Sequence, residues 1–313
     1  MSKTLVFGHR GACGYRPENT LESFELAFVQ GSDAIETDLV PTKDGRVILR
    51  HENALSKTTD VALHENFKAR FRKGWADGHR IKDWFSEDFT LEEISQLRAT
   101  ERLPDLRPGS AKFDGVFGIA TVADLLNAEF AIGKTLILEL KHGAHFEELG
   151  LNLPQLLVAE LARVDWKARG NKLIIESFDW HCLLEAKRLL GDSAKYVFLS
   201  DHWRLAHGGY SASHHILDEY LADVAEKFDG ISVDFGTLFE PRDEKDPNAQ
   251  FGEQTHFAKL AKKHGLMVFG YTARVEEAVN SVEEYYHHIV STGVDAVFAD
   301  QPDLLQNFLG GLA

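Results

Sequence analysis

The chain has 313 residues, of which 44% are hydrophobic and 27% are charged. These fractions are close to those of ordinary globular proteins, so they exclude a disordered chain, a collagen-like repeat and a low-complexity sequence. Lys and Arg number 34 against 49 Asp and Glu, which gives a formal net charge of −15. A surface with this charge repels polyphosphates and anionic membranes, and we therefore expect no nucleic-acid partner.

The sequence also indicates where in the cell the protein is located. The N-terminal residues reach charged side chains before any apolar stretch long enough for an export signal. A membrane span would need about 18 consecutive apolar residues, and the sequence contains no such run. Its two cysteines, Cys13 and Cys182, belong to a chain long enough to fold without disulfides. We expect a cytoplasmic protein with no membrane span, and the sequence does not indicate its oligomeric state.

Short apolar or β-branched runs recur along the chain, each followed by polar residues and separated from the next by an amphipathic stretch. We predict eight strands, at residues 5–8, 34–36, 136–138, 173–175, 196–199, 230–233, 267–270 and 296–298. The main helices are predicted at residues 20–30, 153–163, 181–190, 217–227, 257–263 and 275–291. This repeated alternation predicts an α/β fold of the (β/α)8 type, the TIM barrel.

The chain is longer than a typical TIM barrel of about 250 residues, which indicates an additional segment. We expect residues 1–313 to form a single TIM-barrel domain with a small insertion at about residues 52–115, after a hairpin on the second strand. A helix is predicted at residues 90–100, where Thr90 and Glu93 have the spacing of a capping box. We expect the insertion to pack as a cap over the barrel mouth.

Aromatic residues are frequent in this insertion. Phe67, Phe71 and Trp75 follow one another at i, i+4 and i+8, which is the spacing of a buried helix face. An aromatic cage for a quaternary ammonium group is the alternative interpretation. Trp84 and Phe85 lie outside the helical pattern and are candidates for substrate contact.

In a TIM barrel the active site is built at the carboxyl ends of the strands. Glu36 ends the second predicted strand and Asp38 follows two residues later, which places both on one face, and Glu139 follows the third strand. Three carboxylates at one site repel one another unless a cation lies among them, and oxygen ligands favour Mg²⁺ or Ca²⁺ over zinc. The plain alternative is that each acid pairs with a Lys or Arg. We predict that the three residues bind one divalent cation.

Two histidines reach the same end of the barrel. Asp44-Gly45 predicts a hairpin with a two-residue turn, and counting outward from it brings Asp38 opposite His51. His9 ends the first strand. A lone histidine at a strand end is usually a packed or solvated residue, but two beside an acidic cluster favour catalysis. Because imidazole titrates near neutrality, we predict that His9 and His51 accept and donate protons.

Two cations accompany these groups. Arg10 follows His9, and Lys141 lies two residues after Glu139. A guanidinium and an ammonium group beside a metal ion suit an anionic substrate such as a phosphoryl group, and we predict that both bind it. Transfer of a nucleotide γ-phosphate is disfavoured, because the sequence has no phosphate-binding Gly-x-x-x-x-Gly-Lys-Ser/Thr loop.

The sequence resembles the glycerophosphodiester phosphodiesterase family over nearly its whole length. The matching motifs, in the family's order, are His9-Arg10-Gly11, Pro17-Glu18-Asn19-Thr20, Glu36-x-Asp38, Lys43-Asp44-Gly45 with His51, Glu139-x-Lys141, Ser177-Phe178, Gly293-Val294-Asp295-Ala296 and Asp300-x-Pro302. The resemblance implies a TIM barrel that hydrolyses glycerophosphodiesters to sn-glycerol 3-phosphate and an alcohol. It implies the site roles given above, with a neighbouring hydroxyl of the substrate as nucleophile and a cyclic phosphate that water then opens.

Some positions depart from the family pattern or have a simpler role. Glu52 follows His51 where Asp is usual. The segment 269–274 reads Phe-Gly-Tyr-Thr-Ala-Arg where Trp-Thr-Val-Asn is common, so we expect Gly270 and Arg274 to change the pocket wall. Asn19 has Glu22 three residues later, and we interpret it as the N-cap of the first helix.

Other functions stay open from the sequence. A lysophospholipase D-like or sphingomyelinase D-like enzyme would share the histidines and carboxylates and would have an apolar groove at the barrel mouth. A non-catalytic phosphodiester-binding barrel would lack one of these groups, and none is missing. An amidohydrolase-type barrel would need a His-x-His pair, whereas Arg10 and Gly11 follow His9.

Overall fold

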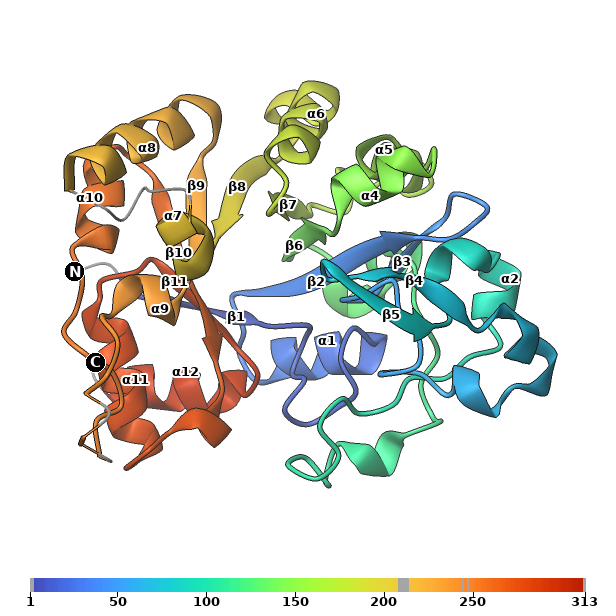
Figure 1. Ribbon diagram of the computed structural model, residues 1–313, viewed down its shortest axis with the longest axis horizontal. Helices are drawn as coiled ribbons and strands as arrows, with labels where there is room; N and C mark the ends of the chain where they lie inside the picture. Colours follow the sequence, from blue (N-terminus) through green and yellow to red (C-terminus); the bar gives the residue numbers. More distant parts are fainter. Residues whose placement is uncertain (1–2, 208–213, 244, 247, 312–313) are drawn as a thin grey trace.

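The computed structural model describes residues 3–207, 214–243, 245–246 and 248–311. Eight parallel strands form a closed barrel, in the order β1 (Leu5–Gly8), β2 (Ala34–Pro41), β6 (Thr135–Leu140), β7 (Lys172–Ser177), β8 (Lys195–Ser200), β9 (Gly230–Asp234), β10 (Met267–Ala273) and β11 (Ala296–Ala299). The ring closes because β1 pairs with both β11 and β2. The predicted TIM barrel and its eight strands are confirmed (Figure 1).

Helices surround this barrel. Those between one strand and the next are α1 (Leu21–Val29), α3 (Val122–Asn127), α5 (Leu153–Leu161), α6 (Trp180–Leu190), α8 (His214–Lys227), α10 (Phe257–Lys263) and α11 (Val282–Ser291), and α12 (Pro302–Gly311) follows the last strand. Short helices follow three strands directly: α4 (Gly143–Glu148), α7 (His202–His207) and α9 (Phe235–Leu238). The predicted helix at 275–291 is divided, because a short 3-10 turn at Val275–Glu277 ends before Ser281 caps α11. None of the helices in the described residues has the length and apolar character needed to cross a bilayer.

Aromatic side chains fill the barrel below its carboxyl-terminal end. Phe7 makes edge-to-face contacts with Phe269 and Phe298, with ring centroids 5.1 and 5.3 Å away. Ala34 and Ile137 belong to the same buried cluster. Because side chains alternate along a strand, the residues two positions after these also point into the barrel, one layer closer to its carboxyl-terminal end. These residues include His9, Glu36 and Glu139, so the polar side chains lie directly above the apolar layer.

The hairpin after β2 has a different register from the predicted one. β3 (Val47–Leu49) pairs with β2 so that Leu39 is opposite Leu49. The loop therefore has three residues and ends in Gly45 at φ +74°. A three-residue loop with Gly in the left-handed region also suits an Asp-Gly sequence, so the two-residue turn was the wrong choice. Asp38 consequently lies opposite Arg50, whose backbone N–H donates to the Asp38 carbonyl at 2.8 Å.

The segment 52–115 contains a second hairpin where a helix was predicted. After a 3-10 turn (Glu65–Arg70), β4 (Arg72–Ala76) and β5 (His79–Asp83) pair around a tight turn. The turn residues Asp77 and Gly78 have φ values of 48° and 75°, as a two-residue turn requires. Trp75 is 52% exposed, which shows that the helical spacing of the aromatics was misleading. A second correction concerns α2 (Leu91–Ile94), which has the predicted Thr90 capping box but is only one turn long.

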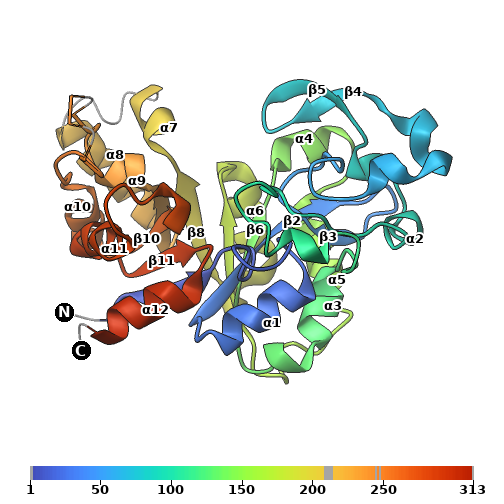
Figure 2. The ribbon, with the colours of Figure 1, turned by 90° about the horizontal axis from the view of Figure 1, so that it is seen from below.

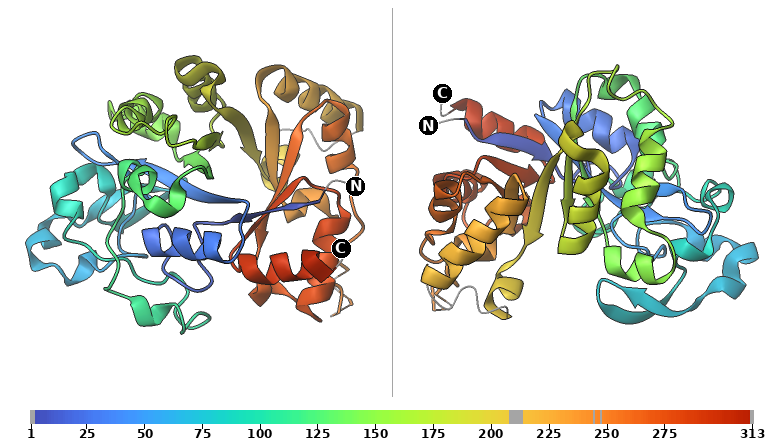
Figure 3. Two further views of the ribbon diagram at one scale, coloured as in Figure 1. Left: turned by 180° about the vertical axis from the view of Figure 1, so that it is seen from behind. Right: turned by 90° about the horizontal axis from the view of Figure 1, so that it is seen from above.

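The arrangement of these parts determines where the site can lie. Figures 2 and 3 show the β4–β5 hairpin on the side of the barrel away from α8 and α10. In Figure 2 the hairpin lies next to α4, and residues of both line one cavity. Loops from the barrel and from the segment 52–115 therefore meet above the strand ends.

Candidate active site

Three carboxylates come together at the ends of β2 and β6. Asp38 and Glu139 are opposite each other in the pairing of these strands, and Glu36 is two residues before Asp38. One oxygen from each of the three lies within 4.8 Å of the others, and all three residues are buried. Burial and the neighbouring acids Asp38 and Glu139 raise the pKa of Glu36 well above its usual range. The predicted cluster is present in the fold.

A fourth acid borders this cluster. Glu176 is next to last in β7, pairs in register with Glu139 and is 1% exposed. Its Oε1 is buried without a hydrogen-bond partner among the described residues. Burial and the nearby Glu139 and Asp38 raise the pKa of Glu176 well above its usual value. Several buried acids with too few cations to pair with all of them are the surroundings that a divalent cation requires, so an oxygen-only Mg²⁺ or Ca²⁺ site fits these residues.

Asp38 contacts one hydrogen-bond donor and two cations. Its Oδ2 accepts from Asn19 Nδ2 at 2.9 Å and lies 3.2 Å from Arg10 Nε, and its Oδ1 is 3.6 Å from Lys141 Nζ. These cations overcome the effect of burial and hold the pKa of Asp38 well below its usual range. Asn19 is therefore not the helix cap predicted from its spacing. Thr20 is the cap, and its side chain accepts from the Ser23 N–H.

His9 lies against a carboxylate from the other end of the chain. Its Nδ1 is 2.6 Å from Oδ1 of Asp300, which follows β11. Burial, and then the charge of Arg10, lower the pKa of His9. Against the effect of burial, His9, Arg107 and Arg274 keep the pKa of Asp300 well below its usual range. An ionised Asp300 accepts a hydrogen bond from Nδ1–H of His9, so Nε2 of the ring is available to a reacting group.

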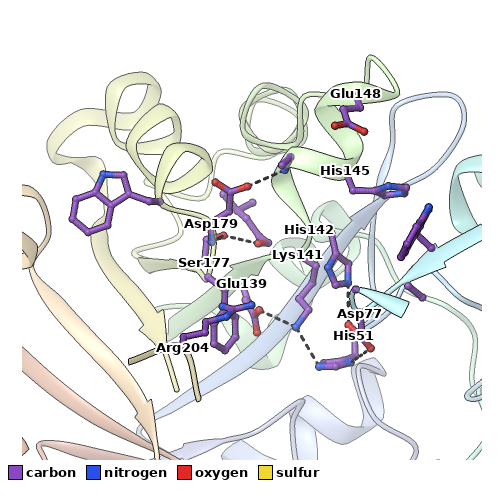
Figure 4. Close-up of a pocket in the computed structure, with 17 residues that line it drawn as sticks. His51, Asp77, Glu139, Lys141, His142, His145, Glu148, Ser177, Asp179 and Arg204 are labelled. Atoms are coloured by element: carbon purple, nitrogen blue, oxygen red, sulfur yellow. Dashed lines mark hydrogen bonds and ion pairs between the residues drawn. The ribbon is translucent and has the colours of Figure 1, made fainter. Parts of the chain in front are cut away.

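His51 lies between a carboxylate and an ammonium group. Its Nδ1 is 3.1 Å from Oε1 of Glu52. Its Nε2 is 3.2 Å from Lys141 Nζ, a contact that Figure 4 shows. Burial, and then the charges of Arg10 and Lys141, lower the pKa of His51 to about 4. Although the predicted pairing with Asp38 was off by one residue, the chain after β3 still carries His51 to the acidic cluster.

The two predicted substrate cations also lie here. Arg10 is 8% exposed, and its Nη1 donates to Oε2 of Glu18 at 3.1 Å. Lys141 is 6% exposed, and its Nζ is 2.8 Å from Oε1 of Glu139. Although burial would lower it, these acids and Asp38 raise the pKa of both cations. Both groups are therefore charged beside the carboxylates.

Two cavities meet at these residues. The smaller, of about 410 Å³, contains His9, Arg10 and Glu36. The larger, of about 940 Å³, extends between the β4–β5 hairpin and α4. Five residues line both cavities: His51, Asp77, Glu139, Lys141 and Phe178. A molecule with a central anionic group and two arms could bind the shared residues and extend into both.

Three expectations about the cavity walls were wrong. A Cβ at Gly270 would meet Phe235 and Leu238 of α9, so this position faces the helices. Phe85 is fully buried, and Trp84 donates its Nε1–H to the Phe67 carbonyl at 2.7 Å, so neither lines a cavity.

Sequence reasoning also missed residues that support the histidines. Asp300 was a polar strand end without an assigned role, and Arg102 and Arg107 were unassigned. Arg274 does line the smaller cavity, but its Nε donates to Asp300 at 3.2 Å. The available signal for Asp300 was its place just after the last strand, which pairs with β1 when the barrel closes and so brings Asp300 beside His9.

Comparisons with known proteins agree with this geometry. Residues 9–304 match the model of the glycerophosphoryl diester phosphodiesterase family. The chain is 28% identical to the glycerophosphodiester phosphodiesterase of Haemophilus influenzae, over 99% of this chain and 91% of that protein. It is 26% identical to the enzyme of the same name from Treponema pallidum, over 99% and 92% of the two chains.

A solved structure shows the same fold. The phosphodiesterase of Oleispira antarctica, in complex with the product sn-glycerol-3-phosphate, superimposes with a TM-score of 0.66 at 21% identity, over 98% of this chain and 97% of the other. The match of the family model to nearly the whole chain settles the relationship. The chain belongs to the glycerophosphoryl diester phosphodiesterase family and is an enzyme of that class.

Proposed function

We propose that the protein hydrolyses glycerophosphodiesters to sn-glycerol 3-phosphate and an alcohol, with the help of one divalent cation, Mg²⁺ or Ca²⁺. The observation that carries the proposal is the cluster of the Glu36, Asp38 and Glu139 carboxylates beside two joined cavities, which His9 and His51 also line. The family relationship gives the reaction class, and these groups provide the means to carry it out.

The three carboxylates would hold the cation. When bound, the cation would act as a Lewis acid toward a phosphoryl oxygen. Arg10 and Lys141 add two positive charges from the protein, and both lie where a phosphoryl group near the carboxylates would contact them. Donors of this kind stabilise the negative charge that develops on the phosphoryl oxygens.

The histidines differ in their surroundings, and this supports different roles. His51 lies beside Lys141, and with a pKa of about 4 it is unprotonated at neutral pH. It is suited to accept the proton of the attacking hydroxyl. His9 faces the Asp300 carboxylate, which stabilises a positively charged ring against the opposing effects of burial and Arg10, and we assign to it the donation of a proton to the leaving alcohol.

The cavities suggest where the arms of the diester lie. We place the glycerol in the smaller cavity and the alcohol in the larger one, with the phosphorus at the shared residues. The walls of the larger cavity combine apolar side chains, such as Trp75 and Trp180, with the polar or charged side chains of Asp77, His142, His145, Glu148, Asp179 and Arg204 (Figure 4). The charged groups suit a polar alcohol, and burying them against the long acyl chain of a lysophospholipase D or sphingomyelinase D substrate would be unfavourable.

One catalytic domain formed by residues 1–313 agrees with these contacts. Glu52, Lys57, Asp77 and Arg102 of the segment 52–115 line the smaller cavity together with barrel residues, as a cap over the mouth would. A cytoplasmic location agrees with the buried free thiols of Cys13 and Cys182.

The test is a coupled assay for sn-glycerol 3-phosphate released from glycerophosphocholine and glycerophosphoethanolamine. We expect release that stops with chelator and returns with Mg²⁺ or Ca²⁺. A Glu36→Gln preparation, purified in parallel, controls for contaminating enzymes and should be inactive. Chelator-resistant release would refute the metal requirement, and no release with either cation would refute the substrate assignment.

A further inference from the structure

One loop of the segment 52–115 contacts the supports of both histidines. Residues 101–110 carry Arg102 and Arg107, five positions apart. The loop is tied to itself, because the Arg107 N–H donates to the Leu103 carbonyl at 2.8 Å and Ser110 Oγ donates to the Glu101 carboxylate. The two arginines are therefore presented from one fixed piece of chain.

Arg102 holds the carboxylate next to His51. Its Nη1 and Nη2 donate to the two oxygens of Glu52, the latter at 2.8 Å. Its Nε and Nη2 donate to the two oxygens of Glu18, both at 2.6 Å. All three side chains are less than 14% exposed. A planar guanidinium bound in this way fixes the plane and direction of both carboxylates.

Arg107 holds the carboxylate next to His9. Its Nη2 donates to Oδ2 of Asp300 at 2.5 Å, and the other oxygen of Asp300 faces His9. Its Nε donates to Glu276 at 2.7 Å and its Nη1 to the Cys13 carbonyl at 3.2 Å. The side chains of Arg107 and Asp300 are 6% and 2% exposed. The chain of contacts from Arg102 to His51 has the same order, but its last step is an ion-pair contact of 3.1 Å, whereas His9 and Asp300 are hydrogen-bonded at 2.6 Å.

We propose that Arg102 and Arg107 are positioning residues for the reaction, each orienting one histidine through the carboxylate it holds. The inference rests on the proposed function, because it takes His9 and His51 as the proton-transfer groups. A carboxylate fixed at Nδ1 keeps a proton on that nitrogen and directs Nε2 toward the substrate, where His51 accepts a proton and His9 donates one. The loop 101–110 thus prepares both imidazoles at once.

The alternative is that the arginines only anchor the loop to the barrel. Both interpretations predict some loss of thermal stability on substitution, so stability does not distinguish them. The two interpretations differ in which histidine ring each substitution affects. Anchoring would affect both histidines or neither, whereas positioning assigns Arg102 to His51 and Arg107 to His9.

The first experiment reads the rings without turnover, so it stays informative if the substrate assignment fails. Long-range ¹H–¹⁵N NMR of the imidazoles reports which nitrogen carries the proton, and spectra of His9→Ala and His51→Ala assign the two rings. We expect Arg102→Gln to change the His51 signals alone and Arg107→Gln the His9 signals alone. Arg70→Gln is the matched control, because Arg70 pairs with Glu93 in the same segment, and it should change neither ring.

The second experiment measures kcat. We expect each substitution to lower kcat by about 10- to 100-fold, the size typical of residues that orient functional groups. Replacement of either arginine by Lys should restore little activity, because an ammonium group cannot bind both oxygens of a carboxylate as the planar guanidinium does. Against a His51→Ala background Arg102→Gln should cost nothing further, while Arg107→Gln keeps its effect. The reverse should hold for His9→Ala.

These outcomes decide the proposal. It is overturned if folded Arg102→Gln and Arg107→Gln proteins keep wild-type ring signals, or if each arginine lowers kcat equally in both histidine backgrounds. If the wild type releases no sn-glycerol 3-phosphate but the ring signals change as expected, the proposed substrate is wrong and the positioning role stands.

Discussion

The ammonium nitrogen of Lys141 lies 3.2 Å from Nε2 of His51. Because an ammonium group only donates hydrogen bonds, this contact requires an Nε2 without a proton. The proton of the neutral ring is then on Nδ1, which faces Glu52 at 3.1 Å. The His51 ring is therefore held in the neutral form that can accept a proton at Nε2, the nitrogen next to Lys141.

Replacing Lys141 by Met should therefore shift the acid side of the pH profile. A base works only when unprotonated, so activity is lost as the pH falls through its pKa. Burial and the charges of Arg10 and Lys141 lower the pKa of His51 to about 4, and loss of one cation should move it up toward its usual value of about 6.5. We expect log kcat/KM of Lys141→Met to fall at a higher pH than that of the wild type. Lys57→Met is the control from the same cavity, and an equal shift in it would refute the assignment.

Substitution of either histidine by Ala should lower kcat by about 100-fold or more, as expected for a general acid or base. A glycerol phosphate ester of p-nitrophenol separates the roles, because this leaving group needs no protonation. The defect of His9→Ala should shrink with this ester and that of His51→Ala should persist. The opposite pattern would exchange the two roles, and wild-type kcat in either variant would remove that histidine from the mechanism.

The parts of the site that the sequence could predict follow from strand alternation. His9 and Lys141 come just after β1 and β6, Glu139 is next to last in β6, and Glu36 and Asp38 lie within β2, which continues past its predicted end to Pro41. The barrel geometry brings these residues together whatever the loops do. The supports of the histidines could not be found in this way. Arg107 and Asp300, for example, are 193 positions apart, and no local pattern pairs a loop arginine with one acid among many.

Local turn chemistry explains the other errors. Asp-Gly at 77–78 makes a two-residue turn and Asp-Gly at 44–45 belongs to a three-residue loop, so the same dipeptide serves two registers. The choice at 44–45 depends on Thr42, whose Oγ1 accepts from the Arg46 N–H at 3.0 Å. In the segment 65–76 the aromatic spacing was coincidental, because Trp75 is on a hairpin and half-exposed.

Cation binding should release protons. Burial and the neighbouring acids Asp38 and Glu139 raise the pKa of Glu36 well above its usual range, so its carboxyl group keeps its proton to a higher pH than an ordinary glutamate does. A bound cation requires the ionised form, and the proton must leave. Calorimetric titration with Mg²⁺ or Ca²⁺ in buffers of different ionisation enthalpy should show this release, and Glu36→Gln should abolish it. A binding enthalpy independent of the buffer would contradict the prediction.

Trp75 offers a test of the larger cavity that leaves the chemistry untouched. Its indole lines this cavity from β4 and is 52% exposed, so Trp75→Ala should change the free energy of unfolding by less than about 0.5 kcal/mol. If the alcohol lies in this cavity, loss of the indole should raise KM for glycerophosphocholine while kcat changes little, because the residue contacts no reacting group. Leu63→Ala removes a more exposed apolar side chain of the same segment, outside both cavities, and should leave KM unchanged. An unaltered KM in Trp75→Ala would move the alcohol elsewhere, and a kcat loss matching that of His51→Ala would mean that the hairpin takes part in catalysis.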